Sequence, residues 1–290
     1  FSYQVDLTPF KQPFAAAHIS WLNDGGILML DDLLPQLGKK TSARIRFDMS
    51  SDLMFVTNED VASPVTFPAT FEVEDVEKAV FFIYSKDAQR HIRSAGDEIE
   101  FDVSGDWQFD SPEAGEIAVG ILDEYKGVFR ASPSGDVLIS LHKFPMPIAG
   151  EAWEADTRGR TITLISTDTN FKSQSLQRLH EQLRHEMFHL WIPNGVNLSG
   201  NYDWFYEGFA LYQSLKTGVA LNRIRFDDYL DTLSRAHDID KAQAQKLSLI
   251  DVSKNRWVGS NNTRGYARGM LVAFLCDLAL LEKSKGKRSV

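Results

Sequence analysis

The segment RLHEQLRHEMFHLW, residues 178–191, decides the fold of this chain. Within it, His185, Glu186 and His189 form the pattern HExxH. Residues four apart on an α-helix lie on one face, so the two imidazoles can bind one metal ion together. Glu186 follows directly, where a carboxylate can take a proton from a water molecule that attacks a carbonyl. The pattern therefore predicts a helix that carries part of a zinc site.

The apolar residues around this pattern favour a helix with one buried side. At about 100° per residue, a single stripe collects the apolar side chains Leu176, Leu179, Leu183, Met187 and Leu190. His185 and His189 fall on nearly the opposite side, and Pro193 and Gly195 end the helical pattern. The alternative is that the two histidines are plain surface residues, or core residues satisfied by hydrogen bonds.

A catalytic zinc ion needs three protein ligands and one open position. Downstream, the segment WFYEGFALY (residues 204–212) places Trp204, Glu207 and Leu211 on one helix face. An unpaired carboxylate among apolar neighbours is costly, and coordination to a cation removes that cost. Glu207 is therefore the candidate third ligand, and a buried ion pair with an arginine or lysine is the alternative.

Composition disfavours several other classes of protein and of metal site. The 290 residues include 31 Lys+Arg and 40 Asp+Glu, a formal net charge of −9. That balance disfavours a nucleic-acid binder, which needs a basic surface. No apolar run reaches the roughly 20 residues that a transmembrane helix requires. Cys276 is the single cysteine, so a metal site must be built from histidine and carboxylate.

The first third of the chain has the pattern of β-strands. Residues 43–49 and 98–103 alternate polar and apolar side chains, and residues 80–84 form a continuous apolar run. Glycine, proline, asparagine and aspartate separate these segments. An antiparallel sandwich or half-barrel is expected.

The pattern changes near Ser111 and Pro112, which we interpret as a helix N-cap followed by the first helical residue. Residues 137–141 and 161–165 then favour strands, and helical patterns dominate from residue 173. We therefore predict a β-rich domain over residues 1–112 and an α+β domain over residues 113–290. Because Val290 closely follows an apolar helical pattern, we expect the second domain to be incomplete at its C-terminus.

These motifs together resemble the aminopeptidase gluzincins, and most closely the glycyl aminopeptidase family. That group has HExxH followed by a helix with the pattern (W/L)xxEGFAxY. Three further stretches agree with the narrower family: residues 248–253 with Trp257 resemble SLxxxS…W, residues 266–271 resemble YxKG before an apolar helix, and residues 275–278 resemble LLDL. The match covers roughly residues 137–290.

The resemblance implies an α+β fold, in which an antiparallel β domain precedes a thermolysin-like (gluzincin) catalytic domain. It implies one zinc ion per chain, held by His185, His189 and Glu207. Glu186 would be the general base and later the proton donor to the leaving amine. Tyr266 would donate a hydrogen bond to the tetrahedral oxyanion, and its alternative role is that of a packing tyrosine at a helix start.

Two departures from the family pattern bear on the site. Seventeen residues, 190–206, separate the second histidine from Glu207, where the related enzymes usually have eighteen. The family's GxMEN or GGLEH strand, whose glutamate binds the substrate's free amine, corresponds here to GEAWEA, residues 150–155. Glu151 and Glu154 are the candidate amine anchors, and an exposed edge carboxylate without a function is the alternative.

The expected function is zinc-dependent hydrolysis of peptides with a free N-terminus. An endopeptidase without amine recognition and a non-catalytic peptide-binding module of the same fold are the alternatives. Zinc-bound histidines usually donate their other N–H to a carboxylate or carbonyl, and Asp203, Asp277 and backbone carbonyls are the candidates here. The resemblance favours an exported bacterial protein, and the sequence leaves the compartment and the oligomeric state open.

Overall fold

The chain forms two compact units, one of residues 1–119 and 132–179, the other of residues 120–131 and 180–290. The computed structural model describes residues 4–6, 19–22, 25–35, 37, 39–61, 68–87, 90–144, 147–196, 198, 200, 202–242, 247–256 and 258–290. Trp257, part of the family-like pattern, lies outside these residues.

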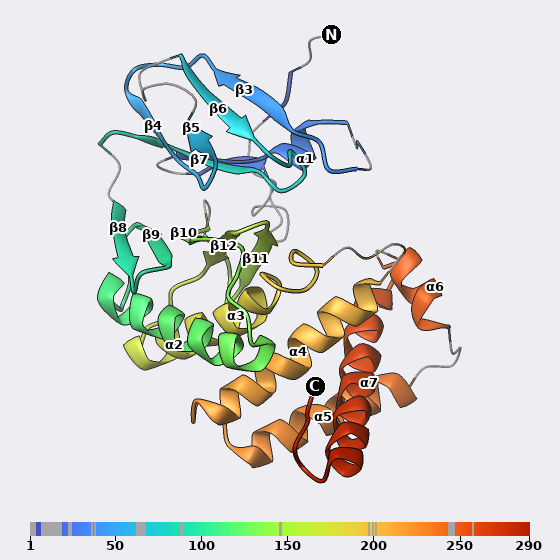
Figure 1. The fold of residues 1–290 in the computed structure, drawn as a ribbon. Helices are drawn as coiled ribbons and strands as arrows, with labels where there is room; N and C mark the ends of the chain where they lie inside the picture. The colour runs from blue at the N-terminus through green and yellow to red at the C-terminus, as the bar shows by residue number, and fades with distance from the viewer. Residues whose placement is uncertain are drawn as a thin grey trace. The chain divides into compact units, whose positions relative to one another are not determined.

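The first unit is built from three sheets (Figure 1). Their strands are β1 (Ile19–Leu22), β2 (Gly25–Met29), β3 (Ala43–Phe47), β4 (Leu53–Val56), β5 (Asp60–Val61), β6 (Ala69–Val73), β7 (Val80–Ser85), β8 (Arg90–Ala95), β9 (Ile99–Ser104), β10 (Val137–Lys143), β11 (Trp153–Arg158) and β12 (Thr161–Ser166). The strand orders are β1-β2-β7-β4, β3-β6-β5 and β11-β12-β10-β9-β8. The short helix α1 (Leu30–Leu33) follows β2.

The apolar run at residues 80–84 is confirmed as the buried strand β7. On one face of its sheet, Phe81 packs into a core with Phe71 of the three-stranded sheet. On the other face, Phe82 shares a core with Leu138 and Ile165 of the five-stranded sheet. A strand that is covered on both faces has no solvent side, so its apolar residues run continuously instead of alternating.

The five-stranded sheet is mixed. β10 pairs in parallel with both β9 and β12, whereas β8 and β11 pair antiparallel at the two edges. Helix α2 (Ser111–Phe129) lies between β9 and β10 in the chain and supplies the crossover that a parallel pair needs. β8 and β9, before residue 112, therefore share one sheet with β10, β11 and β12, after it. The domain boundary expected at residue 112 stays a prediction.

The start of α2 differs from the expectation by one residue. Ser111 is the first helical residue, and Asp110 makes the cap. Asp110 Oδ1 accepts a hydrogen bond from the Glu113 N–H at 3.0 Å, and Glu113 Oε2 accepts one from the Asp110 N–H at 3.1 Å. This reciprocal pair is a capping box, in which an aspartate takes the place predicted for the serine.

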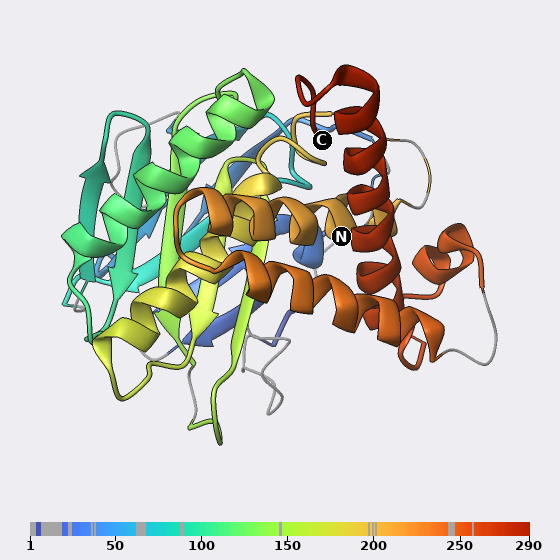
Figure 2. The same ribbon diagram turned by 90° about the horizontal axis from the view of Figure 1, so that it is seen from below.

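The second unit is helical. It contains α4 (Asp203–Ala220), α5 (Phe226–Lys241), α6 (Leu249–Lys254) and α7 (Asn261–Ser284), together with the ends of α2 and of α3 (Lys172–Phe188). In Figure 2, α4 and α5 lie side by side and cross the red helix α7. Tyr212, Leu233 and Met270 share their core. No helix within the described ranges is long and apolar enough to cross a membrane.

Candidate metal centre

The end of α3 carries the HExxH residues. After Phe188 the α-helical hydrogen bonding gives way to bonds between residues three apart, and the His189 N–H donates to the Glu186 carbonyl at 3.0 Å. His189 is thus the first residue past the helix rather than a residue within it. Stacking of Trp191 on Phe129 of α2, with ring centroids 4.9 Å apart, fixes this segment, and the Trp191 indole N–H donates to the Ala131 carbonyl at 3.1 Å.

A close contact between α4 and α7 brings the other predicted site residues together. A Cβ atom on Gly208 would lie 2.4 Å from the Cα of Gly269, and one on Gly269 would lie 2.1 Å from the Trp204 carbonyl oxygen. The helix backbones can therefore touch only because both positions lack a side chain. Glu207 of α4 and Tyr266 of α7 flank this contact and line one cleft.

Three ligand atoms converge between α3 and α4. Glu207 Oε2 lies 3.3 Å from His185 Nε2 and 3.7 Å from His189 Nε2, and the two Nε2 atoms are 3.3 Å apart. Ligand atoms about 2.0–2.2 Å from a tetrahedral zinc ion are separated by about 3.3–3.6 Å. Glu207 Oε2 is buried and makes no hydrogen bond within the described residues. The donor set and its spacing fit zinc.

The charges around the three ligand atoms also favour a cation between them. Burial by itself lowers the pKa of His189, but the carboxylates of Glu207 and Glu186 outweigh it and raise that pKa to about 9. Burial by itself raises the pKa of Glu207, but His185 and His189 hold it well below its usual range. The carboxylates of Glu207 and Glu186 thus stabilise positive charge where a metal ion would lie.

A backbone carbonyl orients one of the two imidazoles. His189 Nδ1 lies 2.9 Å from the Ile192 carbonyl oxygen, so it carries the proton and leaves Nε2 to a metal. The carboxylates considered for this role have other partners, because Asp203 pairs with Arg256 and Asp277 pairs with Lys216. His185 Nδ1 is buried and has no hydrogen-bond partner in the described part of the chain.

Glu186 and Tyr266 complete the group in the second unit. Glu186 is 4% exposed, and its charge raises the pKa of both His189 and Tyr266. Burial is the largest cause of the raised pKa of Tyr266, followed by the charge of Glu207. The Tyr266 phenol therefore keeps its proton at neutral pH and remains a hydrogen-bond donor beside the candidate ligand Glu207.

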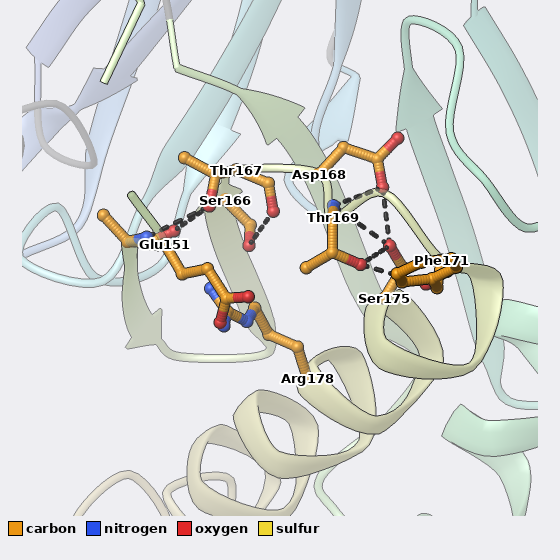
Figure 3. Close-up of polar contacts among 9 residues, drawn as sticks. Glu151, Ser166, Thr167, Asp168, Thr169, Phe171, Ser175 and Arg178 are labelled. Carbon is orange, nitrogen blue, oxygen red and sulfur yellow. Dashed lines mark hydrogen bonds and ion pairs between the residues drawn. The ribbon is translucent and has the colours of Figure 1, made fainter. Parts of the chain in front are cut away.

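The two candidate amine anchors lie in the first unit. Glu151 precedes β11 and makes an ion pair with Arg178 of α3 (Figure 3). Its backbone neighbour Ala152 is tied to Thr167, whose hydroxyl accepts from the Ala152 N–H at 3.0 Å. Glu154 lies on β11, the edge strand of its sheet. An amine-anchoring role for either residue stays a prediction.

Sequence reasoning did not single out Arg256. Its Nη1 donates to Asp203 Oδ1 at 2.7 Å, and it lines the cleft that holds Glu207 and Tyr266. No local pattern distinguishes this arginine, because it follows a six-residue helix, α6, in a segment rich in polar residues. Its partnership with Asp203 spans more than fifty residues of chain.

No protein-family model matches the sequence, and no curated protein matches it either. Solved structures do share the fold. A crystal structure of an aminopeptidase N family protein from Idiomarina loihiensis superposes with a TM-score of 0.73 at 16% identity, over 97% of this chain and 53% of that protein. An M1 zinc metallopeptidase from Deinococcus radiodurans gives a TM-score of 0.58 at 12% identity, over 95% and 62% of the respective chains.

These likenesses confirm the predicted α+β fold class and the resemblance to the aminopeptidase gluzincins at the level of the fold. The chain spans between about half and three fifths of the length of the two proteins it superposes on.

Proposed function

We propose that this chain carries the active site of a zinc-dependent peptidase, with His185, His189 and Glu207 as the metal ligands. The observation that carries the proposal is the triangle of their ligand atoms, with sides of 3.3, 3.3 and 3.7 Å. Two imidazoles and one carboxylate, with a fourth position left open, are a common ligand set of catalytic zinc.

When bound, a zinc ion would polarise the scissile carbonyl and make water acidic enough to attack at neutral pH. The protein's own residues supply the proton movements. Glu186, which is buried, takes a proton from the attacking water and returns it to the leaving amine. Tyr266 donates its phenolic hydrogen to the oxygen on which negative charge develops.

The proposed substrate is a peptide with a free N-terminus, as the family resemblance implies. β11 is an edge strand, and such an edge can pair with an extended peptide. Glu151 makes an ion pair with Arg178, and Glu151 and Glu154 are the two candidate amine anchors. The same ion pair favours the second candidate function, an endopeptidase that makes no use of the amine.

The proposal is tested first with the variant Glu186→Gln. We expect the wild type to bind about one equivalent of zinc, and the variant to bind it equally well but to hydrolyse peptides about 10²- to 10⁴-fold more slowly. The matched control is Glu181→Gln, an exposed residue of the same helix, which should leave both properties unchanged. Absence of zinc from the wild type, or full activity of Glu186→Gln, would contradict the mechanism.

Substrate class is tested with matched pairs of peptides that have a free or an acetylated N-terminus. An aminopeptidase loses nearly all activity on the acetylated member, because the ammonium group is then absent. Equal cleavage of the two would exclude the aminopeptidase and support the endopeptidase. Glu154→Gln should raise KM for the free peptide more than it lowers kcat if Glu154 binds the amine.

A further inference from the structure

Residues of α4, α6 and α7 line a cleft beside the candidate metal centre, and two of its charged residues, Asp203 and Arg256, have no role in the proposed mechanism. Its lining includes Asp203, Trp204, Glu207, Arg256 and Tyr266. The cleft thus places a cationic side chain in the same wall as a candidate metal ligand and the candidate oxyanion donor. A guanidinium that paired with Glu207 would compete with a metal ion for that carboxylate.

Arg256 is held by Asp203. The Arg256 Nη1 atom donates to Asp203 Oδ1 at 2.7 Å, and the Tyr206 hydroxyl donates to the same oxygen. The two charged side chains are 27% and 21% exposed, so water screens the pair only in part. Asp203 is the first residue of α4, one turn before Glu207, and the two carboxylates therefore lie on the same helix face.

A guanidinium is always charged and offers five hydrogen-bond donors that match a carboxylate. Burial by itself lowers the pKa of Arg256, but Asp203, Tyr266 and Glu207 outweigh it and raise that pKa. The charges of Glu207 and Arg256 therefore attract each other in the folded chain. Glu207 is the other acidic residue among those that line the cleft, so it is the carboxylate left there for Arg256 when the Asp203 carboxylate is removed.

We propose that Asp203 is a positioning residue that keeps the Arg256 guanidinium from pairing with Glu207, so that Glu207 stays available to zinc while the positive charge remains beside Tyr266. This inference rests on the proposed function. Held in that place, Arg256 favours the negative charge that develops on the oxygen facing Tyr266. Asp203 thus protects metal affinity, and Arg256 supports turnover.

The test compares the wild type with Asp203→Asn, Arg256→Gln and the double variant. Zinc affinity is measured by competition with a chromophoric chelator, and kcat and KM are measured on the zinc-loaded proteins. Asp203→Asn should weaken zinc binding by about 10- to 100-fold. Arg256→Gln should leave it within about threefold, and the double variant should restore the affinity that Asp203→Asn loses. The Arg256→Gln variant and the double variant should each show a kcat lowered by about tenfold at unchanged KM.

The restoration distinguishes this role from a purely structural one. If Asp203 only fixed the first turn of α4, the double variant would bind zinc as weakly as Asp203→Asn, and that result would overturn the inference. A raised KM at unchanged kcat in Arg256→Gln would also overturn it, because Arg256 would then contact substrate. Lys254→Gln removes an exposed charge two residues away and is the matched control, with no expected effect.

Circular dichroism establishes that each variant is folded. A wild type that binds no zinc contradicts the proposed function and this inference together. A wild type that binds zinc, with variants in any other order of affinity, contradicts the inference alone.

Discussion

At the scale of single residues, the candidate site depends on charges that the fold buries together. His185 and His189 follow from a local pattern, since the four-residue spacing aligns them even though His189 lies one residue past the end of α3. Glu207 and Tyr266 are distant in the chain; the apolar helix face around Glu207 predicted its role, and the family-like pattern around Tyr266 predicted the role of that residue. The partnership of Asp203 with Arg256 had no such signal, and only the folded chain reveals it.

Tyr266→Phe tests the oxyanion role. The variant keeps the ring and removes the donor, so kcat should fall by about 10²- to 10³-fold while zinc affinity is unchanged. Tyr229→Phe is the control, because that hydroxyl donates to Tyr212 in the core of α4, α5 and α7. Steady-state kinetics on a free peptide measures both, and an unchanged kcat in Tyr266→Phe would leave that residue a packing role.

At the scale of elements, two glycines set the distance between α4 and α7. Gly208 follows Glu207, and Gly269 lies one turn after Tyr266, so the same contact that brings the helices together also brings the site residues together. The family-like patterns EGFA and YxRG thus include a packing requirement beside the chemical one.

Gly269→Ala tests this contact. Its new Cβ would meet the Trp204 carbonyl oxygen at 2.1 Å, so α4 and α7 must separate. We expect a loss of about 1–3 kcal/mol in the free energy of unfolding, together with weaker zinc binding. Gly120→Ala in α2 is the control, because no described atom outside the neighbouring backbone of α2 lies within 4 Å of its Cβ, and a helix favours alanine by about 1 kcal/mol. Urea unfolding measures both, and equal stability of Gly269→Ala and the wild type would contradict the packing argument.

Elements defined by local patterns were predicted well, and pairings between distant segments were not. β3, β7, β9, β10 and β12 lie where the apolar patterns placed them. The parallel pairs of β10 with β9 and β12 were not foreseen, because periodicity specifies which face of a strand is buried and not which strand lies beside it. The cap of α2 was wrong by one residue, since Asp110 and Ser111 are both good N-cap residues.

At the scale of the whole molecule, fold similarity persists where sequence similarity has nearly vanished. The chain superposes over 97% of its length on a protein with 16% identity. Buried polar groups help to specify one fold. In the first unit, Asp102 Oδ2 accepts hydrogen bonds from Tyr84 at 2.7 Å and from Ser140 at 2.9 Å. Such a network stabilises one arrangement of strands, because any other would leave its groups unpaired.

The stability of the helical unit should depend on pH through His180. Its Nδ1 accepts a hydrogen bond from Arg184 at 2.7 Å, and burial, with the charges of Arg184 and Arg223, lowers its pKa to about 3. An unfolded histidine titrates near pH 6.5. Between these values the unfolded chain binds a proton that the folded chain does not, so this contribution is complete above about pH 6.5 and is lost as the pH falls toward 3.

The variant His180→Gln isolates this effect. Thermal unfolding followed by circular dichroism between pH 7 and pH 4 should show a smaller loss of Tm for His180→Gln than for the wild type. His237→Gln, which changes an exposed histidine of α5, should follow the wild type. Parallel curves for the wild type and His180→Gln would contradict the assignment.

The central claim is that three residues of this chain hold one zinc ion. Anomalous diffraction at the zinc absorption edge, from crystals of the zinc-loaded protein, tests it most directly. We predict a single peak about 2.0–2.2 Å from His185 Nε2, His189 Nε2 and a Glu207 carboxylate oxygen. A zinc-loaded protein without a peak at that point, or with a peak that Glu207 does not contact, would contradict the account.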